Sequence, residues 1–420
     1  MSWSEWKYPK WLDETSVRTG KKWLDARRED DGAEGLWRIH DSLYDLNEWI
    51  ESHPGGRFWI ETTKGTDITE AFESHHLSDN PEAILPKFFA KKATGPRNSP
   101  FTFNKDGFYH TLKAKVKNHL ANVKNGPATP TKIISDTLAG TTIILSILAG
   151  YYCNYLIGIA AAVFLTGTVI TGHNFFHQRN NWRMYYFNLS LMSARDWRIS
   201  HALSHHLYPN TIHDLEVSMF EPFFQWLPKP NKTLFARYVS WLYAPIVYTL
   251  IYHTQYISRA LTNPDGMYEF VPLVIPGAMM IIGGVNLLAS FVMWNFILFT
   301  SSFIFGCIGL NAAHHHPEIF HDGDVPRADR DWGLFQLDAV RDRLEIKGIL
   351  PLVITLFGDH SLHHLFPTLD HCHLVELYPI LEDTCKEFGY DFKFTTISDL
   401  VQGQFLQLAR NKSKLKQETN

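Results

Sequence analysis

The sequence predicts a multi-domain protein, with a small α+β domain near the N-terminus followed by an all-α membrane domain with about four transmembrane helices. Two stretches, residues 137–178 and 270–317, contain no Asp, Glu, Lys or Arg. One helical crossing of a bilayer needs about 20 apolar residues, so each stretch is long enough for two helices. The overall composition, 45% hydrophobic and 20% charged, therefore averages over two very different regions.

We expect five segments along the chain. They are a Trp-rich N-terminal extension (residues 1–35), the α+β domain (36–95), a linker (96–130), the membrane domain (131–390) and a C-terminal tail (391–420). The extension has no apolar run ahead of a small-residue cleavage site, so we expect no signal peptide and a cytosolic N-terminus. The four Cys are sparse and two lie in the apolar stretches, which argues against a disulfide framework.

A candidate haem pocket lies in the α+β domain. His53 is followed by Pro54, Gly55 and Gly56, which fix the chain after the imidazole and let the backbone pass close to a flat ligand. His75 and His76 follow 22 and 23 residues later, and spacing alone leaves both open as a partner of His53. A haem held from both faces by His has no free position for oxygen, so it would transfer electrons.

This domain resembles the cytochrome b5 family. The resemblance rests on Trp37, on Tyr44 with Asp45, on residues 53–56 and on the run of residues 67–72. It implies haem b as the cofactor and His53 as one axial ligand. Members fused to lipid desaturases place the second His four residues after the Phe of that run, which implies His76. A domain that keeps the fold without haem is the alternative, and the presence of both His argues against it.

Three groups of His lie beside the predicted membrane hairpins. They are His173 and His177, then His201, His205 and His206, and finally His360, His363 and His364. Residues three or four apart share one face of a helix, so each group can present several imidazoles to a metal. A lone His in an apolar run is usually a core residue, but clusters near a membrane are more often functional. Eight nitrogens exceed the four of one zinc site, so we expect two iron ions.

The order HxxxH, HxxxHH, HxxHH resembles the three His boxes of the membrane fatty acid desaturase and hydroxylase family. Trp197 and Arg198 before the second box, Asn210 after it, and residues 364–367 add to the resemblance. It implies that the eight His bind a di-iron centre and that molecular oxygen is a co-substrate. Many desaturases fused to cytochrome b5 carry Gln where this chain has His360, so substrate assignments from that subgroup do not carry over.

A fourth cluster follows the second hairpin. Asn311 and His314 resemble the extra ligands of acyl-CoA desaturases, with a spacing one residue shorter, and we predict His314 as a ninth iron ligand. The alternative for His315, His316 and His321 is a solvated turn. His213 is interpreted in the same way as these three, and the remaining His are expected to be ordinary surface or packing residues: His40, His110, His119, His253, His371 and His373.

The predicted topology places all His clusters on one side of the membrane. From a cytosolic N-terminus each hairpin returns to the cytosol, and the basic residues between the hairpins agree with this orientation. A further span at residues 238–257 would separate the third box from the others, so we interpret this segment as an in-plane interfacial helix. We expect a multi-pass protein of the endoplasmic reticulum membrane with both termini cytosolic.

These features together predict an oxygen-dependent fatty acyl or lipid desaturase. Its substrate would be a lipid or an acyl-CoA, its electrons would come from NADH–cytochrome b5 reductase through its own haem domain, and it would bind no nucleic acid. Two alternatives are a hydroxylase with the same metal centre and a non-catalytic membrane electron carrier with structural zinc. The intact spacing of all three boxes argues against the carrier.

Overall fold

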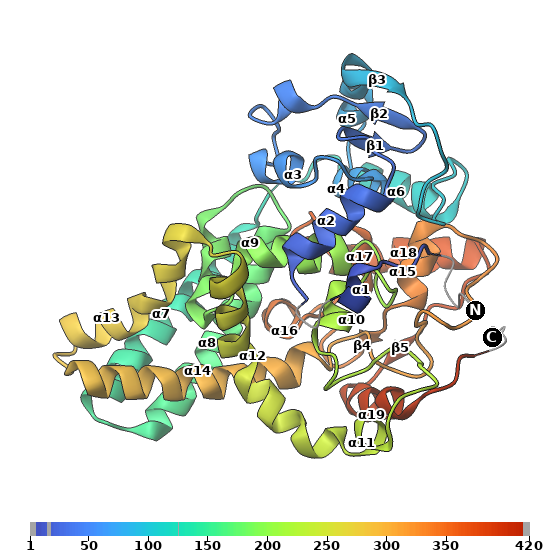
Figure 1. Ribbon diagram of the computed structural model, residues 1–420. Coiled ribbons are helices and arrows are strands. Elements are labelled where there is room, and N and C mark those ends of the chain that lie inside the picture. The colour runs from blue at the N-terminus through green and yellow to red at the C-terminus, as the bar shows by residue number, and fades with distance from the viewer. Residues whose placement is uncertain (1–5, 15–17, 125, 415–420) are drawn as a thin grey trace.

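The computed structural model describes residues 6–14, 18–124 and 126–414. Residues 1–5 of the expected extension and 415–420 of the expected tail lie outside them. A small domain with a three-stranded sheet sits at one end of a larger helical domain (Figure 1). The predicted multi-domain fold class, an α+β domain followed by a helical membrane domain, is confirmed.

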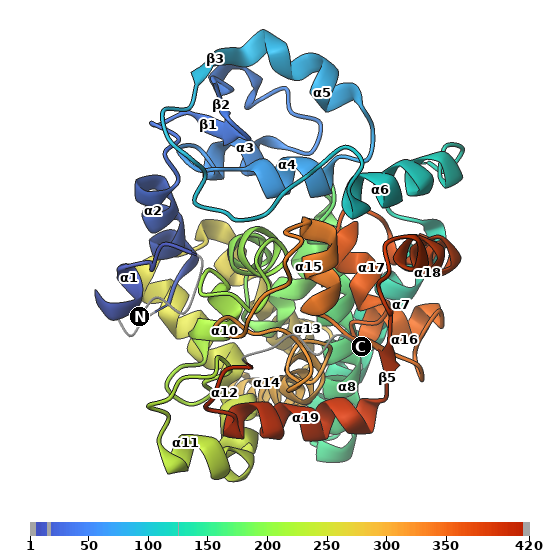
Figure 2. The same ribbon diagram turned by 90° about the vertical axis from the view of Figure 1, so that its right-hand side faces the viewer.

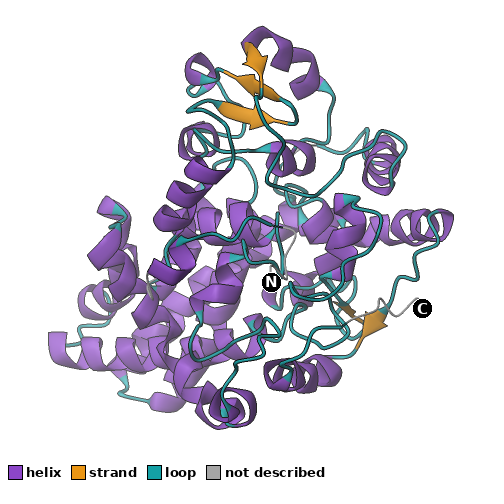
Figure 3. Cartoon of the chain, turned by 45° about the vertical axis from the view of Figure 1, so that its right-hand side comes forward, coloured by secondary structure: helices purple, strands orange, loops and turns teal. Residues whose placement is uncertain are grey.

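The small domain is built around an antiparallel sheet in the order β1 (Trp37–Ile39), β2 (Ser42–Tyr44) and β3 (Phe89–Lys92), seen in orange at the top of Figure 3. All of β1 is buried, because the sheet packs on the helices between β2 and β3. The Trp37 indole donates to the carbonyl of Ile60 (2.9 Å), which ties the sheet to those helices. They are η1 (Asn47–Trp49), α3 (Arg57–Thr62), α4 (Thr69–His75), α5 (Asn80–Ile84) and η2 (Leu85–Phe88).

The Trp-rich extension is part of the core. It forms α1 (Trp11–Glu14) and α2 (Gly20–Asp30), which run along one side of the molecule up to the small domain (Figure 2). Trp6, Trp11 and Trp23 are all buried. The Trp23 indole donates to the carbonyl of His213 (2.8 Å), so the extension is attached to the helical domain. Large aromatic side chains in this segment are therefore explained by the apolar surface that they bury.

The segment expected as a linker also contains a helix. α6 (Phe108–His119) buries Phe108, Tyr109, Leu112 and Val116, whose spacing places them on one face. That face packs on helices near the C-terminal end of the chain. The connection between the two domains is therefore packed against the helical domain along most of its length.

Three helices among the described residues are long and apolar enough to cross a membrane: α7 (Thr129–Tyr151), α8 (Tyr155–Phe176) and α14 (Leu287–Gly309). α7 and α8 form the hairpin expected from the first charge-free stretch. The Asn154 side chain accepts hydrogen bonds from two backbone amides at the start of α8 and begins that helix. α14 packs on α8, and the Thr166 and Ser301 hydroxyls meet between them (2.9 Å).

The second charge-free stretch differs from the expected hairpin of two full-length helices. Its first arm is a shorter apolar segment, Gly266–Ile281, made of η5 (Gly266–Leu273) and α13 (Val274–Ile281). Pro272 lies inside η5 and has no N–H to donate, which interrupts regular α-helix. The expected count of about four spans thus becomes three long helices and one shorter arm in the described residues.

The helix expected near residues 238–257 is present as α12 (Ser240–Thr262), after α11 (Leu234–Tyr238). It packs closely on α14, since a Cβ at Gly306 would lie 2.6 Å from the Cβ of Tyr248. The Ser302 hydroxyl donates to the Tyr248 carbonyl (2.6 Å) at the same contact. Its in-plane orientation stays a prediction.

Short elements lie between and after the long helices along the chain. The strands β4 and β5 pair in parallel. These elements are η3 (Trp182–Ser190), α9 (Ala194–Trp197), the π-helix η4 (Arg198–His205), α10 (Leu215–Met219), α15 (Trp332–Asp338), β4 (Asp342–Arg343), α16 (Leu350–Thr355), α17 (His360–Leu365), η6 (His371–His373), η7 (Val375–Leu377), α18 (Tyr378–Glu387), β5 (Phe394–Thr395) and α19 (Ile397–Ala409).

A buried network of charged and polar groups joins the two domains. Glu70 of α4 accepts hydrogen bonds from the Tyr208 hydroxyl (3.1 Å) and from the Arg97 guanidinium (2.5 Å). Arg97 also donates to Asp67 (2.7 Å), and Arg27 of α2 donates to the Tyr208 hydroxyl (3.0 Å). The Ser99 hydroxyl also donates to Glu70 (2.6 Å), and because Glu70 is fully buried these donors stabilise its charge. The network therefore holds the small domain in one position.

Glu70→Ala should lower the free energy of unfolding by about 3 kcal/mol, because it removes one of the three acceptors of the largely buried Arg97 guanidinium and leaves only Asp67 and the Phe101 carbonyl. Chemical denaturation in detergent, followed by Trp fluorescence, measures this change. Glu82→Ala removes an exposed carboxylate of the same domain and should change stability by less than about 0.5 kcal/mol. Equal losses in the two variants would contradict the role of the network.

Candidate functional site

His53 and His76 lie opposite each other in the small domain, with ring centroids 6.2 Å apart. In each ring Nδ1 hydrogen-bonds to a backbone carbonyl, that of Gly56 for His53 (3.2 Å) and that of Phe72 for His76 (2.9 Å). With Nδ1 as the donor, Nε2 keeps its lone pair for a metal. Two ring nitrogens bound about 2 Å from one metal place their centroids about 6 Å apart, so this spacing fits a haem iron between them.

His75 turns away from that pair. Its Nδ1 lies 3.0 Å from both the Ala71 carbonyl and the Ser74 hydroxyl, and its ring lies 5.7 Å from that of Trp59. Burial lowers the pKa of both His75 and His76 to about 4, so both rings are neutral. The geometry favours His76 over His75 as the partner of His53.

The structure brings all nine His of the predicted metal site together in two groups. Within each group the ring nitrogens lie within 4.8 Å of one another, and all nine side chains are buried. The first group contains His173, His177, His201, His206 and His363; the second contains His205, His314, His360 and His364. The groups adjoin, since the rings of His206 and His364 stack with centroids 4.0 Å apart.

The second His box divides differently from the sequence-based interpretation. His201 and His205, four residues apart, were expected to share one metal. The two all-His groups separate them, but together with Glu216 they also form a third set of possible ligands within 4.8 Å of one another. The reason is that η4 is a π-helix, in which the amide of His206 bonds to the carbonyl of His201 (2.8 Å). Its wider turn brings residues five apart onto one face, so His201 pairs with His206.

The nitrogens in each group face one another. A neutral imidazole has one N–H and one lone pair, so rings that meet through the same nitrogen cannot all be satisfied by one another. Nε2 of His364 is buried without a hydrogen-bond partner in the described residues. A cation that accepts these lone pairs satisfies them all, and this donor set fits one metal ion in each group. The close Nε2–Nε2 pairs are His173–His177 (2.9 Å), His173–His201 (2.8 Å), His201–His206 (3.0 Å), His205–His314 (3.1 Å) and His314–His360 (2.8 Å).

Two carboxylates that the sequence analysis did not single out orient the second box. Asp214 accepts from Nδ1 of His205 (2.8 Å), and Glu216 accepts from Nδ1 of His201 (3.0 Å). Hydrogen bonds of this kind fix the tautomer and turn Nε2 toward a metal. Asp214 and Glu216 lie 9 and 15 residues after the His that they orient, so no regular spacing marks them.

In the second group, other hydrogen-bond acceptors orient the His rings. The Ala339 carbonyl accepts from His314 Nδ1 (2.9 Å), and Gln336 Oε1 lies 3.0 Å from His364 Nδ1. Asn210, which the family resemblance had singled out, donates to the His314 carbonyl (3.0 Å). Asn210 therefore fixes the loop that carries His314.

Burial and the two carboxylates control the charge of the site. Burial lowers the pKa of His206 and His364 well below the usual value, so these rings are neutral, the form that binds metals. Burial would lower the pKa of His205 too, but the carboxylates of Asp214 and Glu216 raise it. Burial raises the pKa of Glu216 to about 7. The carboxylates thus favour positive charge at the site, which a metal ion also supplies.

Four further His differ from the expectations for them. His315 stacks on Trp226 with centroids 3.7 Å apart, and His213 and His321 are buried, so none of the three belongs to a solvated turn. His371, expected to be an ordinary residue, is buried with its ring 4.5 Å from that of His363. It belongs to neither His group, and its Nδ1 lies 2.6 Å from the Asn174 side chain.

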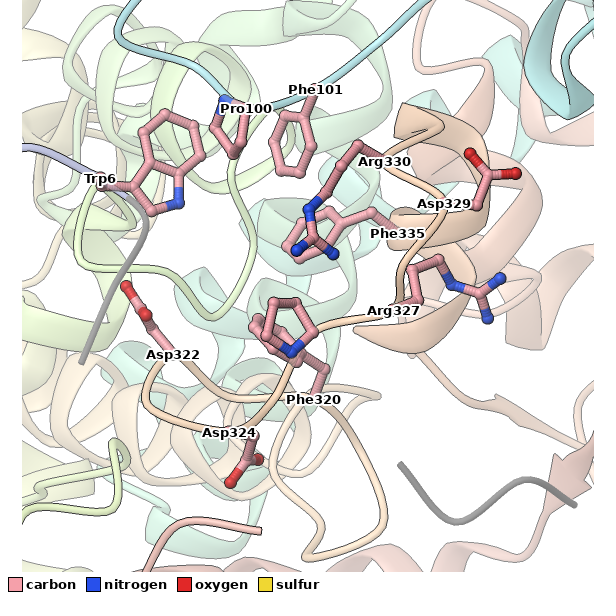
Figure 4. Close-up of a pocket in the computed structure, with 11 residues that line it drawn as sticks. Trp6, Pro100, Phe101, Phe320, Asp322, Asp324, Arg327, Asp329, Arg330 and Phe335 are labelled. Carbon is pink, nitrogen blue, oxygen red and sulfur yellow. The ribbon is translucent and has the colours of Figure 1, made fainter. Parts of the chain in front are cut away.

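A cavity of about 40 Å³ lies elsewhere, between the N-terminal segment and the loop of residues 320–335 (Figure 4). Trp6, Phe101 and Phe335 line it together with Asp322 and Arg327. This volume has room for a few water molecules and is too small for an acyl chain. The two His groups are therefore the candidate site, and this cavity is separate from it.

Comparisons with known proteins identify both the haem domain and the desaturase domain. Residues 150–396 match the fatty acid desaturase family, and residues 22–93 match the cytochrome b5-like haem/steroid-binding domain. The cytochrome b5-related protein of Drosophila melanogaster is 45% identical over 96% of this chain and 94% of its own length. Delta(5) fatty acid desaturase A of Dictyostelium discoideum is 26% identical over 90% of this chain and 91% of its own length.

The sn-1 linoleoyl-lipid 6-desaturase of Arthrospira platensis is 26% identical over 54% of this chain and 65% of its own length. No solved structure matches the chain at a significant level. The motifs of both domains in one chain predict a likeness to the insect cytochrome b5-related protein, and the comparison confirms it. The chain therefore belongs to the fatty acid desaturase family of membrane oxidoreductases, and it carries a cytochrome b5-like haem-binding domain before its desaturase domain.

Proposed function

We propose that this protein is a di-iron acyl desaturase that receives its electrons through its own haem domain. The observation that carries the proposal is the gathering of nine buried imidazoles into two adjoining groups, one of five and one of four. Each group offers enough nitrogen ligands for one iron ion, and no single zinc site uses nine. A non-catalytic carrier does not account for them.

The proposed ligands follow the two groups. His53 and His76 would hold haem b, and the nine clustered His would hold the two irons. When bound, the haem carries single electrons, and the iron pair activates molecular oxygen for removing hydrogen from an unactivated C–H bond. His360, where many fused desaturases have Gln, would be an iron ligand, since its Nε2 lies 2.8 Å from that of His314.

The protein itself supplies position and environment. Asp214 and Glu216 keep Nε2 of His205 and His201 available by accepting from Nδ1. The buried rings leave little room for water near the metal ions. The apolar helices α8 and α14 end next to the His groups, so an acyl chain lying along them would bring its C–H bonds to the site.

The relatives suggest the chemical class of the substrate. By name, the Dictyostelium protein is a fatty acid desaturase and the Arthrospira protein acts on a linoleoyl lipid. We therefore propose an acyl chain carried on a lipid or on coenzyme A. The proposed electron source is NADH–cytochrome b5 reductase, and the proposed location is the endoplasmic reticulum membrane with both termini cytosolic.

Haem binding is tested by single substitutions in the full chain. His53→Ala and His76→Ala should each abolish a low-spin b-type absorption spectrum, because each removes one of the two opposed rings. His75→Ala should keep the spectrum, since its ring lies outside that pair. Loss of haem in His75→Ala together with its retention in His76→Ala would reverse the assignment.

Metal analysis tests the iron site. The purified protein should contain about two non-haem iron ions per chain, because the two His groups offer two complete donor sets. His205→Ala and His364→Ala should each remove desaturation and leave the haem spectrum unchanged, since the two sites lie in different domains. A preparation with one zinc and no non-haem iron would rule out the di-iron proposal.

The reaction outcome is tested by mass spectrometry of lipids from cells that lack their own desaturases and express this chain. Desaturation yields products lighter than their precursors by one pair of hydrogens. Hydroxylation, which begins with the same hydrogen abstraction, yields products heavier by one oxygen. We expect the lighter products, and we expect them to disappear in His201→Ala. Heavier products that depend on His201 would identify a hydroxylase.

A further inference from the structure

One face of the haem domain is packed against the desaturase domain next to the first His group. At the tip of the haem-ligand loop, a Cβ added to Gly56 would lie 2.7 Å from the side-chain nitrogen of Asn180. Gly56 has a φ of 105°, so its backbone also requires glycine. The loop that follows His53 can therefore approach the segment after His177 closely, and no side chain at residue 56 separates them.

Arg198 connects this face to the first His box. Its guanidinium lies over the Trp59 ring of α3, 4.8 Å from the centroid, and is almost wholly buried. The same side chain donates to the carbonyl of Phe176 (2.9 Å) and to Asn180 (2.8 Å), on either side of His177. A planar guanidinium can stack on a ring and donate in its plane at once, which an ammonium cannot do.

His75 reaches the same region from α4. Its ring packs on Trp59, and its carbonyl accepts from the Thr368 hydroxyl (3.3 Å), shortly after the third His box. Its Nε2 is buried and has no hydrogen-bond partner among the described residues. His75 therefore lies against the segment that follows the third His box, and it is bonded through the chain to the proposed haem ligand His76.

The buried network described above keeps these contacts in place. Tyr208 follows His206 by two residues and bonds to Glu70, which lies on α4 with His75. The contacts of His75 and Trp59 therefore belong to one fixed arrangement of the two domains, since separating the domains would break the buried hydrogen bond between Tyr208 and Glu70.

We propose that Trp59 and His75 form the junction through which electrons pass from the haem pocket to the five-His group, with Arg198 holding Trp59 in position. This inference rests on the proposed function, in which the haem domain is the electron donor. At each passage one electron leaves the reduced haem, which is oxidised, and reduces an iron ion near His177. No bond forms or breaks, Trp59 and His75 are not themselves oxidised, and the reductase restores the reduced haem.

The test uses the full-length protein with its haem and iron. The haem is reduced by NADH and the reductase, the protein is mixed with oxygen and acyl substrate, and haem reoxidation is followed by stopped-flow absorbance. Trp59→Leu and His75→Leu should keep the low-spin spectrum and the iron content but slow reoxidation about tenfold, which corresponds to about 1.4 kcal/mol of barrier. Trp59→Phe and His75→Phe should restore most of the rate, because an aromatic ring again fills the gap.

Trp49→Leu is the matched control. Trp49 lies in the same domain and packs on Phe88, with ring centroids 5.6 Å apart. Because Trp49 is not part of the proposed junction, Trp49→Leu should leave the reoxidation rate unchanged. Wild-type rates in both Leu variants would overturn the junction. If His75→Leu loses haem because it neighbours His76, the pair Trp59→Leu and Trp59→Phe decides the outcome.

His364→Ala separates this inference from the proposed function. It removes a proposed ligand of the second iron and should abolish the fast phase of reoxidation. Fast reoxidation in His364→Ala would mean that the haem does not pass electrons to the irons, and both proposals would fail. A fast phase that is lost in His364→Ala but kept in the Leu variants of Trp59 and His75 would overturn the junction alone.

Discussion

The packing of nine buried imidazoles with their nitrogens facing one another is the constraint on which this structure depends. Such an arrangement leaves lone pairs unsatisfied unless a cation lies between them, and burial removes the alternative of water. The four segments that carry the rings come from the end of α8, from η4, from the loop after α14 and from α17. The membrane helices and the connections between them must therefore end at one place.

The groups around the rings explain several otherwise unusual features. A π-helix is a rare element, and here it directs His201 and His205 to different groups. Asp214 is fully buried and lies against His205, a position that a carboxylate occupies at low cost only beside a cation or a donor. Asn210 adopts a left-handed backbone conformation (φ 58°) while holding the His314 loop, and Asn tolerates this conformation better than most residues.

The position of the haem domain follows from charge as well as from packing. The extension, α4 and the connection after β3 all contribute buried charged groups to the network around Tyr208. Buried ion pairs are poor sources of net stability but strongly penalise arrangements that leave one partner alone. Buried ion pairs therefore suit a contact between domains that must keep one geometry. The contact between the haem domain and the desaturase domain places α3 and α4 over the end of α8.

The sequence by itself determined the features that depend on local spacing and composition. The charge-free stretches indicated the membrane hairpins, and the spacing of the His boxes and of residues 53–76 indicated a haem domain before a metal site. Both kinds of pattern depend only on residues that are close together in the sequence, so they can be recognised without knowledge of the tertiary structure. The shorter arm at Gly266–Ile281 departed from the expectation because prolines altered a segment whose composition alone looked uniform.

Only the tertiary structure decided how the His divide between the two groups and which residues support them. His201 pairs with His206 because of a π-helix that no spacing rule predicts. Asp214, Glu216 and the contact of Arg198 with Trp59 join segments whose separation along the chain carries no periodic signal. Such contacts arise from the packing of distant segments, and that packing is settled by burial and charge across the whole molecule.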